Sequence, residues 1–291
     1  MRAMWATIAM CALAALGSMP RVAAQSALAD LLDHATRYVL DYEQAFTLLV
    51  SDEEYLQWME RPTNPGTNLS RNNPGGGMVA GGQRNNHVVR SDYVLLHLGE
   101  GQGWAPFRDV YDVNGRETRH HDDRLAQLFV ANSPDAFQLA SKIHAESKRH
   151  DLGNIVRTIN HPLLAMAFLH PRVRERFAFK HDGDESIAGR VVERVTYRET
   201  ARPTLIKTTR GRDLGLEGRL WIDSGTGAVV KTEMIAADPV VRAQVTVTFR
   251  RDGQLGLWVP STMDEYYKAY VALDEVFAKA TYTNARLYEG K

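Results

Sequence analysis

The chain has 291 residues and carries 35 Lys and Arg side chains against 35 Asp and Glu side chains. This balance argues against nucleic acid as a partner, because a phosphate backbone calls for a strongly basic face. Cys11 is the only cysteine and lies near the N-terminus, so we expect no disulfide, thiol nucleophile or cysteine–metal site in the remaining chain.

Residues 1–24 have the residue order of a secretory signal peptide. Arg2 precedes an uncharged run from Ala3 to Leu16, and small residues follow up to Ala24. The run is shorter than the ~20 apolar residues that a membrane-spanning helix needs. We therefore expect cleavage near Ala24 and an extracytoplasmic location, periplasmic or secreted, with a retained N-terminal anchor as the alternative. We expect residues 25–291 to form a single domain.

The first predicted helix covers residues 26–42, with Ser26 as its N-cap. Its apolar residues recur at helical spacing, and they are Leu28, Leu31, Leu32, Ala35, Tyr38, Val39 and Tyr42. Residues 46–58 then predict a long strand. Residues 61–87 are rich in Gly, Pro and Asn and predict a flexible loop.

Two more strands and a helical block follow. Residues 88–98 predict a strand, and residues 104–113 predict another that pairs with residue 116 onward across Asn114-Gly115, a strong hairpin signal. The helical block holds three predicted pieces. They contain Leu125, Leu128 and Phe129, then Ser133-Pro134 to about Arg149, and then residues 160–169, which Pro171 is expected to stop.

From Arg174 onward, apolar and polar residues alternate with a period of two. Val245, Val247 and Phe249, for example, alternate with polar neighbours. One apolar face and one solvent-exposed face are typical of an antiparallel sheet, and the turn signals predict a meander of roughly seven strands. The fold class is therefore α+β.

The stretch LWIDSGTGAVV, residues 220–230, has two interpretations. Asp-Ser-Gly-Thr resembles the catalytic loop of an aspartic protease, but a pepsin-like site needs two such loops with carboxylates that share a proton, and a single loop would need a dimer. A hairpin explains every residue. Asp223 can bond to the backbone of its own turn, and Gly225 and Gly227 can adopt positive φ. We interpret the stretch as a hairpin.

The longer stretch from Gly218 to Glu233 resembles a hairpin of periplasmic proteins with the LolA/LolB lipoprotein-carrier fold, and the order of helix, strands, helices and strands is similar too. The resemblance implies an open, strongly curved antiparallel sheet, a half-barrel, whose concave face is covered by helices and binds acyl chains. The chain departs from the carriers in its loop at 61–87 and in its extra strands. It is more similar to a secreted bacterial family built on that scaffold than to a lipoprotein carrier.

The densest polar cluster consists of His120, His121, Asp122 and Asp123. Adjacent histidines in a strand point to opposite faces, so they do not easily share one metal ion. The acidic pair favours the start of the next helix instead. His161 and His170, each followed by Pro, read as helix boundaries. We expect no metal, no cofactor and no catalytic residue.

Three functions remain open. The first is a non-enzymatic extracytoplasmic protein that binds or carries a hydrophobic or lipid-like ligand, with peripheral membrane contact. The second is a hydrolase that uses Asp223 or the His120–Asp123 cluster, and the third is a secreted interaction module. Oligomeric state is not indicated. The predicted cavity-lining residues, which could equally fill a solid core, are Trp104, Phe107, Met166, Phe168, Trp221, Phe249 and Trp258.

Overall fold

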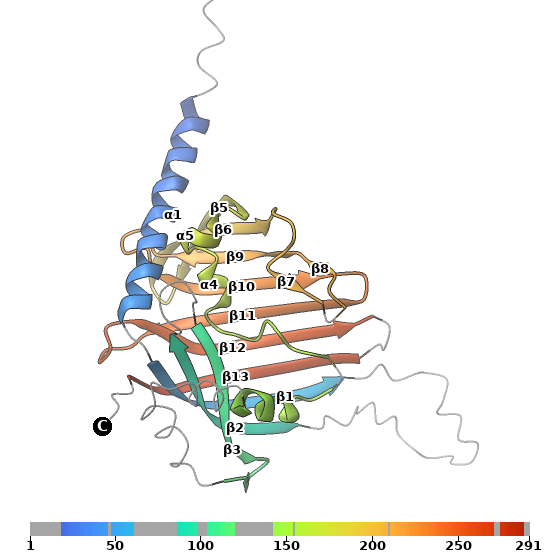
Figure 1. Cartoon of the computed structure of the whole chain (residues 1–291). Helices are drawn as coiled ribbons and strands as arrows, with labels where there is room; N and C mark the ends of the chain where they lie inside the picture. The colour runs from blue at the N-terminus through green and yellow to red at the C-terminus, as the bar shows by residue number, and fades with distance from the viewer. Residues whose placement is uncertain are drawn as a thin grey trace, which may run out of the picture.

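One large antiparallel sheet dominates the protein (Figure 1). The computed structural model describes residues 19–45, 48–60, 86–97, 104–119, 142–153, 155–208, 210–270 and 274–287. The strands of the sheet are β1 (Leu48–Glu60), β2 (His87–His97), β3 (Trp104–Val113), β4 (Arg116–Glu117), β5 (Phe177–Ile187), β6 (Arg190–Glu199), β9 (Leu216–Ile222), β10 (Val229–Ala237), β11 (Val241–Arg251), β12 (Trp258–Ala269) and β13 (Asp274–Leu287). A separate short hairpin consists of β7 (Ile206–Lys207) and β8 (Asp213–Leu214).

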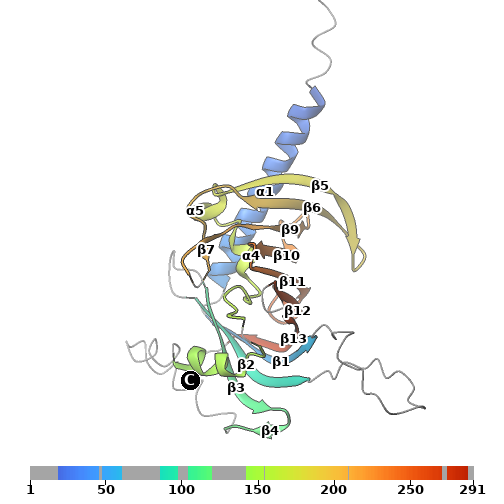
Figure 2. The ribbon, with the colours of Figure 1, turned by 90° about the vertical axis from the view of Figure 1, so that its right-hand side faces the viewer.

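The order of the 11 strands is β4-β3-β2-β1-β13-β12-β11-β10-β9-β6-β5, and neighbours pair antiparallel. β1 links the strands of the N-terminal half to the last strand of the chain. Its residue Tyr55 pairs with Val89 of β2 on one side and with Ala280 of β13 on the other. β4 and β5 end the order without pairing with each other, so the sheet is open. It is also strongly curved (Figure 2). The predicted α+β class with an open, curved antiparallel sheet is confirmed.

The predicted strands and turns agree closely with the structure. β5, β6 and β9 to β13 form the expected meander, and β1 to β3 match the three strands expected before the helical block. Asn114 and Gly115 both have positive φ, 54° and 77°, which is the backbone that a tight two-residue hairpin turn requires.

Helix α1 (Met19–Ala45) confirms the first predicted helix, but it starts earlier than expected. Ser26 lies inside it, so the prediction that Ser26 caps the helix is wrong for the full chain. The apolar stripe is correct, because Leu31, Ala35 and Val39 are buried against the sheet.

The helical block is more broken than the sequence indicates. Residues 142–147 are helical and continue into a 3-10 turn (Lys148–His150), and α4 covers only Leu164–Ala167. Pro171 does not end a helix but begins α5 (Pro171–Arg174), whose N-cap is His170. A ring nitrogen of His170 accepts a hydrogen bond from Arg172 N at 3.2 Å, which satisfies one free amide of this turn. The predictions for residues 61–85 and 120–141 lie outside the described residues.

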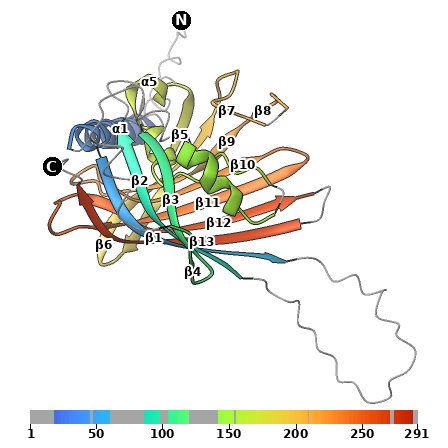
Figure 3. The ribbon, with the colours of Figure 1, turned by 60° about the horizontal axis from the view of Figure 1, so that its bottom comes forward.

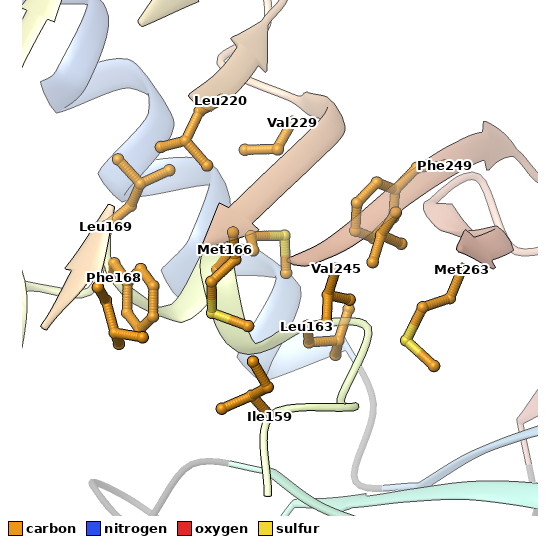
Figure 4. Close-up of a cluster of buried hydrophobic side chains, with 14 of the residues drawn as sticks. Ile159, Leu163, Met166, Phe168, Leu169, Leu220, Val229, Val245, Phe249 and Met263 are labelled. Atoms are coloured by element: carbon orange, nitrogen blue, oxygen red, sulfur yellow. The ribbon is translucent and has the colours of Figure 1, made fainter. Parts of the chain in front are cut away.

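The main core lies between the sheet and the helices. We call this side of the sheet the inner face; it carries Tyr55, Val195 and Val245, and the opposite side is the outer face. Residues around α4 point directly at the inner-face strands (Figure 4). Met166 and Phe168 are buried there together with Phe249 of β11. Burial of each such side chain stabilises the fold by about 1.5–3 kcal/mol, so this contact fixes α4 on the sheet. Figure 3, with the bottom of the molecule turned forward, shows β13, β12, β11, β10 and β9 side by side in the sheet.

Candidate functional site

Asp223 belongs to the turn between β9 and β10. Its Oδ1 accepts hydrogen bonds from the backbone N and the hydroxyl of Thr226, both at 2.9 Å, and its Oδ2 lies 3.4 Å from Arg190 Nη1. Both carboxylate oxygens are therefore engaged in holding the turn. The hairpin interpretation is confirmed, but the prediction of positive φ is correct only for Gly227 and wrong for Gly225.

The same turn forms the platform on which α1 rests. His34 Nδ1 lies 3.4 Å from the carbonyl oxygen of Ser224. Gly227 has a φ of 72°, and a β-carbon at this position would overlap the backbone of His34 and Ala35. Glycine is thus needed here twice, for the backbone angle and for the close approach of the helix. The motif that carries the resemblance has a structural role in this chain.

The predicted lining residues fall into different parts of the molecule. Met166, Phe168 and Phe249 come together in the main core on the inner face. Phe107 packs with Ile143 in a smaller cluster. On the outer face, Trp221 packs in a third cluster with partly buried Trp258, which also touches the main core. Trp104 begins β3, and its side chain lies outside the described residues.

A group of buried charged residues lies beside this apolar core. Arg108 Nε donates a hydrogen bond to Glu53 Oε2 at 2.7 Å, and Ser91 Oγ donates to the same oxygen at 2.8 Å. The Arg108 guanidinium also lies 4.3 Å from the centre of the Tyr55 ring and 5.4 Å from that of Tyr93. A cation over aromatic faces is stabilised by their negative surface, so Arg108 is held from two sides.

A second arginine also contacts Tyr55. Arg157, from the segment before α4, donates hydrogen bonds to the Tyr55 hydroxyl and, at 2.8 Å, to the carbonyl oxygen of Leu152. Its guanidinium lies 5.3 Å from the Tyr267 ring centre, and the Tyr267 hydroxyl donates to Glu265 Oε2 at 2.5 Å. We call the set Glu53, Tyr55, Tyr93, Arg108, Arg157, Glu265, Tyr267 and Tyr282 the polar cluster.

Burial controls the protonation of the polar cluster. It raises the pKa of Glu265, and the positive charges of Arg157 and Arg108 offset only part of that effect. For Arg108, burial alone would lower the pKa, but the Glu53 carboxylate and nearby phenols raise it well above its usual range. Burial, assisted by the charge of Arg108, lowers the pKa of nearby His161 to about 3. The cluster therefore keeps two cations on a largely apolar face, while His161 stays neutral.

Several buried polar atoms of the cluster lack a hydrogen-bond partner within the described part of the chain. They are Arg108 Nη2, Arg157 Nε, Glu53 Oε1, Glu265 Oε1 and the hydroxyls of Tyr93 and Tyr282. A cavity of about 30 Å³ is lined in part by three of these residues, Tyr93, Arg108 and Arg157. A buried polar group without a partner costs about 1–3 kcal/mol, so water or a bound polar group would stabilise these atoms.

The sequence pattern did not reveal this cluster. Glu53 and Tyr55 stand in an ordinary alternating strand, and nothing in their spacing shows that Glu53 is buried. Arg157 comes from an irregular segment that Gln57 holds against the inner face. Gln57 Nε2 donates a hydrogen bond to His150 O, and Leu152 N donates one to Gln57 Oε1, both at 2.8 Å. The signal that could have found the cluster is an excess of tyrosines on inward positions of β1, β2, β12 and β13.

Neither family models nor curated proteins give a match to the chain. Among solved structures, it is similar to an "outer membrane lipoprotein-sorting protein domain" from Vibrio parahaemolyticus, with 11% identity, a TM-score of 0.40, and coverage of 89% of this chain and 94% of that one. It is also similar to a DUF1329 family protein from Desulfovibrio piger ATCC 29098, with 10% identity, a TM-score of 0.36, and coverage of 90% and 93%.

Proposed function

We propose that the protein is a non-enzymatic extracytoplasmic protein, a single domain after cleavage near Ala24, that binds an amphiphilic, lipid-like ligand on the inner face of its sheet. The apolar part of the ligand packs where Met166, Phe168 and Phe249 now meet, and its polar or anionic head contacts Arg108 and Arg157. The observation that carries this proposal is the continuity between a buried apolar core and a set of buried, unpartnered hydrogen-bonding atoms.

Physical chemistry supports an anionic head group. Buried cations are costly unless they are paired and hydrogen-bonded, and Arg108 Nη2 and Arg157 Nε lack partners in the described part of the chain. A phosphate or carboxylate would accept from both arginines in charge-assisted hydrogen bonds. The acyl chain would contribute about 0.8 kcal/mol for each buried CH₂ group.

Binding requires the segment that covers the inner face to move, because the cavity of about 30 Å³ has room for only about one water molecule. We call residues 151–170 the cover segment. It is tied at one end by Gln57 and at the other by Thr36, whose hydroxyl donates to Leu169 O at 3.0 Å. Between these ties, an acyl chain would take the place of the apolar side chains of the cover segment against the sheet.

Contact with a membrane surface forms the second part of the proposal. A groove of about 290 Å³ is lined by Val156, Val240, Lys207 and Arg210, among others. Val156 is 60% exposed, although its neighbour Ile155 packs against the main core. Exposed apolar side chains beside cations suit an anionic bilayer, where each cation contributes about 1 kcal/mol. In this proposal, contact through the groove brings the cover segment next to the lipid source. No helix within the described residues is long and apolar enough to span a membrane.

Native mass spectrometry of the mature protein tests the binding proposal. The protein is purified without detergent from an extract that contains membranes. We expect a co-purified lipid, and we expect an anthroyloxy-labelled fatty acid to bind with an increase in fluorescence. Arg157→Met should weaken binding of this probe at least tenfold, whereas Arg198→Met, on a side chain that is 73% exposed, should leave it unchanged. Absence of lipid together with absence of probe binding would overturn the proposal.

A further inference from the structure

A group of three potential metal ligands lies on the β5–β6 hairpin, far along the sheet order from β1 and β2 of the polar cluster. His181 Nε2 is 3.4 Å from Asp184 Oδ1 and 3.5 Å from Glu193 Oε2. One ligand atom from each residue lies within 4.8 Å of the others. Figure 2 shows this hairpin curling beyond the neighbouring strands.

A β-bulge brings the three side chains together. His181 pairs with Val195 and Asp184 pairs with Glu193, so β5 has one residue more than β6 between these two pairs. Residues three apart in a regular strand point to opposite faces, and the extra residue places His181 and Asp184 on the same one. Gly183, with a φ of 103°, lies within the bulge. The backbone thus holds an imidazole and two carboxylates around one point.

The distances suit a shared metal ion better than an ion pair. A charge-assisted N–H···O bond spans about 2.7–2.9 Å, and one Nε2–H cannot donate well to two carboxylates. A tetrahedral ion with ligand distances of about 2.1 Å separates its ligands by about 3.4 Å, which matches both separations of His181.

The Asp184 and Glu193 carboxylates are available to bind a cation, because the nearby arginine pairs with other acids. The other acids of the hairpin, Asp182 and Glu185, bond to Arg194 at 2.8 and 3.3 Å. Among the described residues, the only ion-pair partner of Asp184 and Glu193 is His181. The His181 and Asp184 side chains are 43% and 63% exposed, so an ion could enter from solvent and keep an open coordination position.

We propose that His181, Asp184 and Glu193 bind a divalent transition-metal ion of the zinc class. The imidazole ligand and the presence of only two carboxylates disfavour Mg²⁺ and Ca²⁺, which prefer oxygen ligands in larger number. The ion would join the edge strand β5 to β6 across the bulge and so stabilise an exposed sheet edge. This proposal is independent of ligand binding on the inner face.

Isothermal titration of the untagged mature protein with ZnCl₂ tests the site. All of the proteins compared also carry His120→Ala and His121→Ala, so that these two adjacent histidines cannot bind the ion. We expect one Zn²⁺ per chain and a raised melting temperature, and His181→Ala, Asp184→Asn or Glu193→Gln should each weaken binding at least tenfold. Asp182→Asn is the matched control, since it removes the same charge from the same hairpin, and it should retain the affinity within about twofold.

Two results would overturn the proposal. One is the absence of stoichiometric Zn²⁺ binding in the folded protein. The other is binding that His181→Ala leaves unchanged, which would place the ion elsewhere. Because the three side chains are exposed or half-exposed, we expect the variants to fold normally, and far-UV circular dichroism checks that they do. Titration with Mg²⁺ under the same conditions should give no heat of binding, and equal affinity for Mg²⁺ and Zn²⁺ would contradict the assigned metal class.

Discussion

The backbone of α1 at His34 lies directly against Gly227 of the β9–β10 turn, leaving no room for a β-carbon. Gly227→Ala should therefore push α1 away from the sheet and add strain at a φ of 72°, at a cost of about 2–4 kcal/mol. Urea denaturation followed by tryptophan fluorescence measures the loss. Gly225→Ala, two residues away, is the control, because its β-carbon would make only one ordinary contact, 3.4 Å from Asp223 Oδ1. Equal stabilities of the two variants would contradict this packing.

The Glu53–Arg108 pair leads to a second prediction. Glu53→Ala leaves the Arg108 charge buried without its main partner, so we expect a loss of about 3–5 kcal/mol in the free energy of unfolding. Glu54→Ala on the next residue of β1 removes a pair whose side chains are 56% and 47% exposed, so its loss should stay below about 1 kcal/mol. Parallel denaturant titrations compare the two variants, and similar losses would show that Glu53 is not buried as described.

Glu265 makes stability depend on pH in a defined direction. Burial raises the pKa of Glu265 in the folded protein, so the folded state holds this proton more tightly than the unfolded chain does. The resulting stabilisation is complete below the unfolded pKa and is lost as pH rises through the folded pKa. Glu265→Gln cannot lose a proton, so its stability relative to the wild type should increase between pH 4 and pH 8. A stability difference between Glu265→Gln and the wild type that stays constant with pH would contradict the prediction.

Substitutions of Asp223 test whether this residue stabilises the turn or acts as a catalytic carboxylate. Asp223→Ala removes the acceptor for two bonds from Thr226, and we expect a loss of about 1–3 kcal/mol. Asp223→Asn keeps the Oδ1 acceptor and should lose less than half as much. Thermal denaturation measures both. A peptidase activity that both variants abolish without any change in melting temperature would instead support the hydrolase interpretation.

Much of the fold could be predicted from the sequence, because the relevant signals are local. The alternation in β11 and the turn residues Asn114-Gly115 each depend on a few neighbouring positions. The pairing of β1 with β13 joins residues more than 200 positions apart, and no local pattern indicates it. The breaks among the helices also follow from tertiary contacts, such as the hold of Gln57 on residues 150–152.

The two candidate sites could not be read from the sequence for the same reason. Arg108 and Arg157 meet only because the cover segment crosses the sheet beside Tyr55. His181 and Asp184 share a face only because of a bulge, and a regular strand would separate them. Of the predicted lining residues, Met166, Phe168 and Phe249 come together in the main core, whereas Phe107 and Trp221 lie in other clusters, because apolar character alone does not tell which face of the sheet a residue occupies.

Photochemical crosslinking with a diazirine-labelled fatty acid tests the central claim most directly, because it identifies the residues that touch the acyl chain. We expect labelled peptides from the cover segment, residues 151–170, and from β11 and β12. We expect excess unlabelled fatty acid to suppress this labelling. Labelling confined to the outer-face cluster around Trp221, or labelling that the competitor does not reduce, would contradict binding on the inner face.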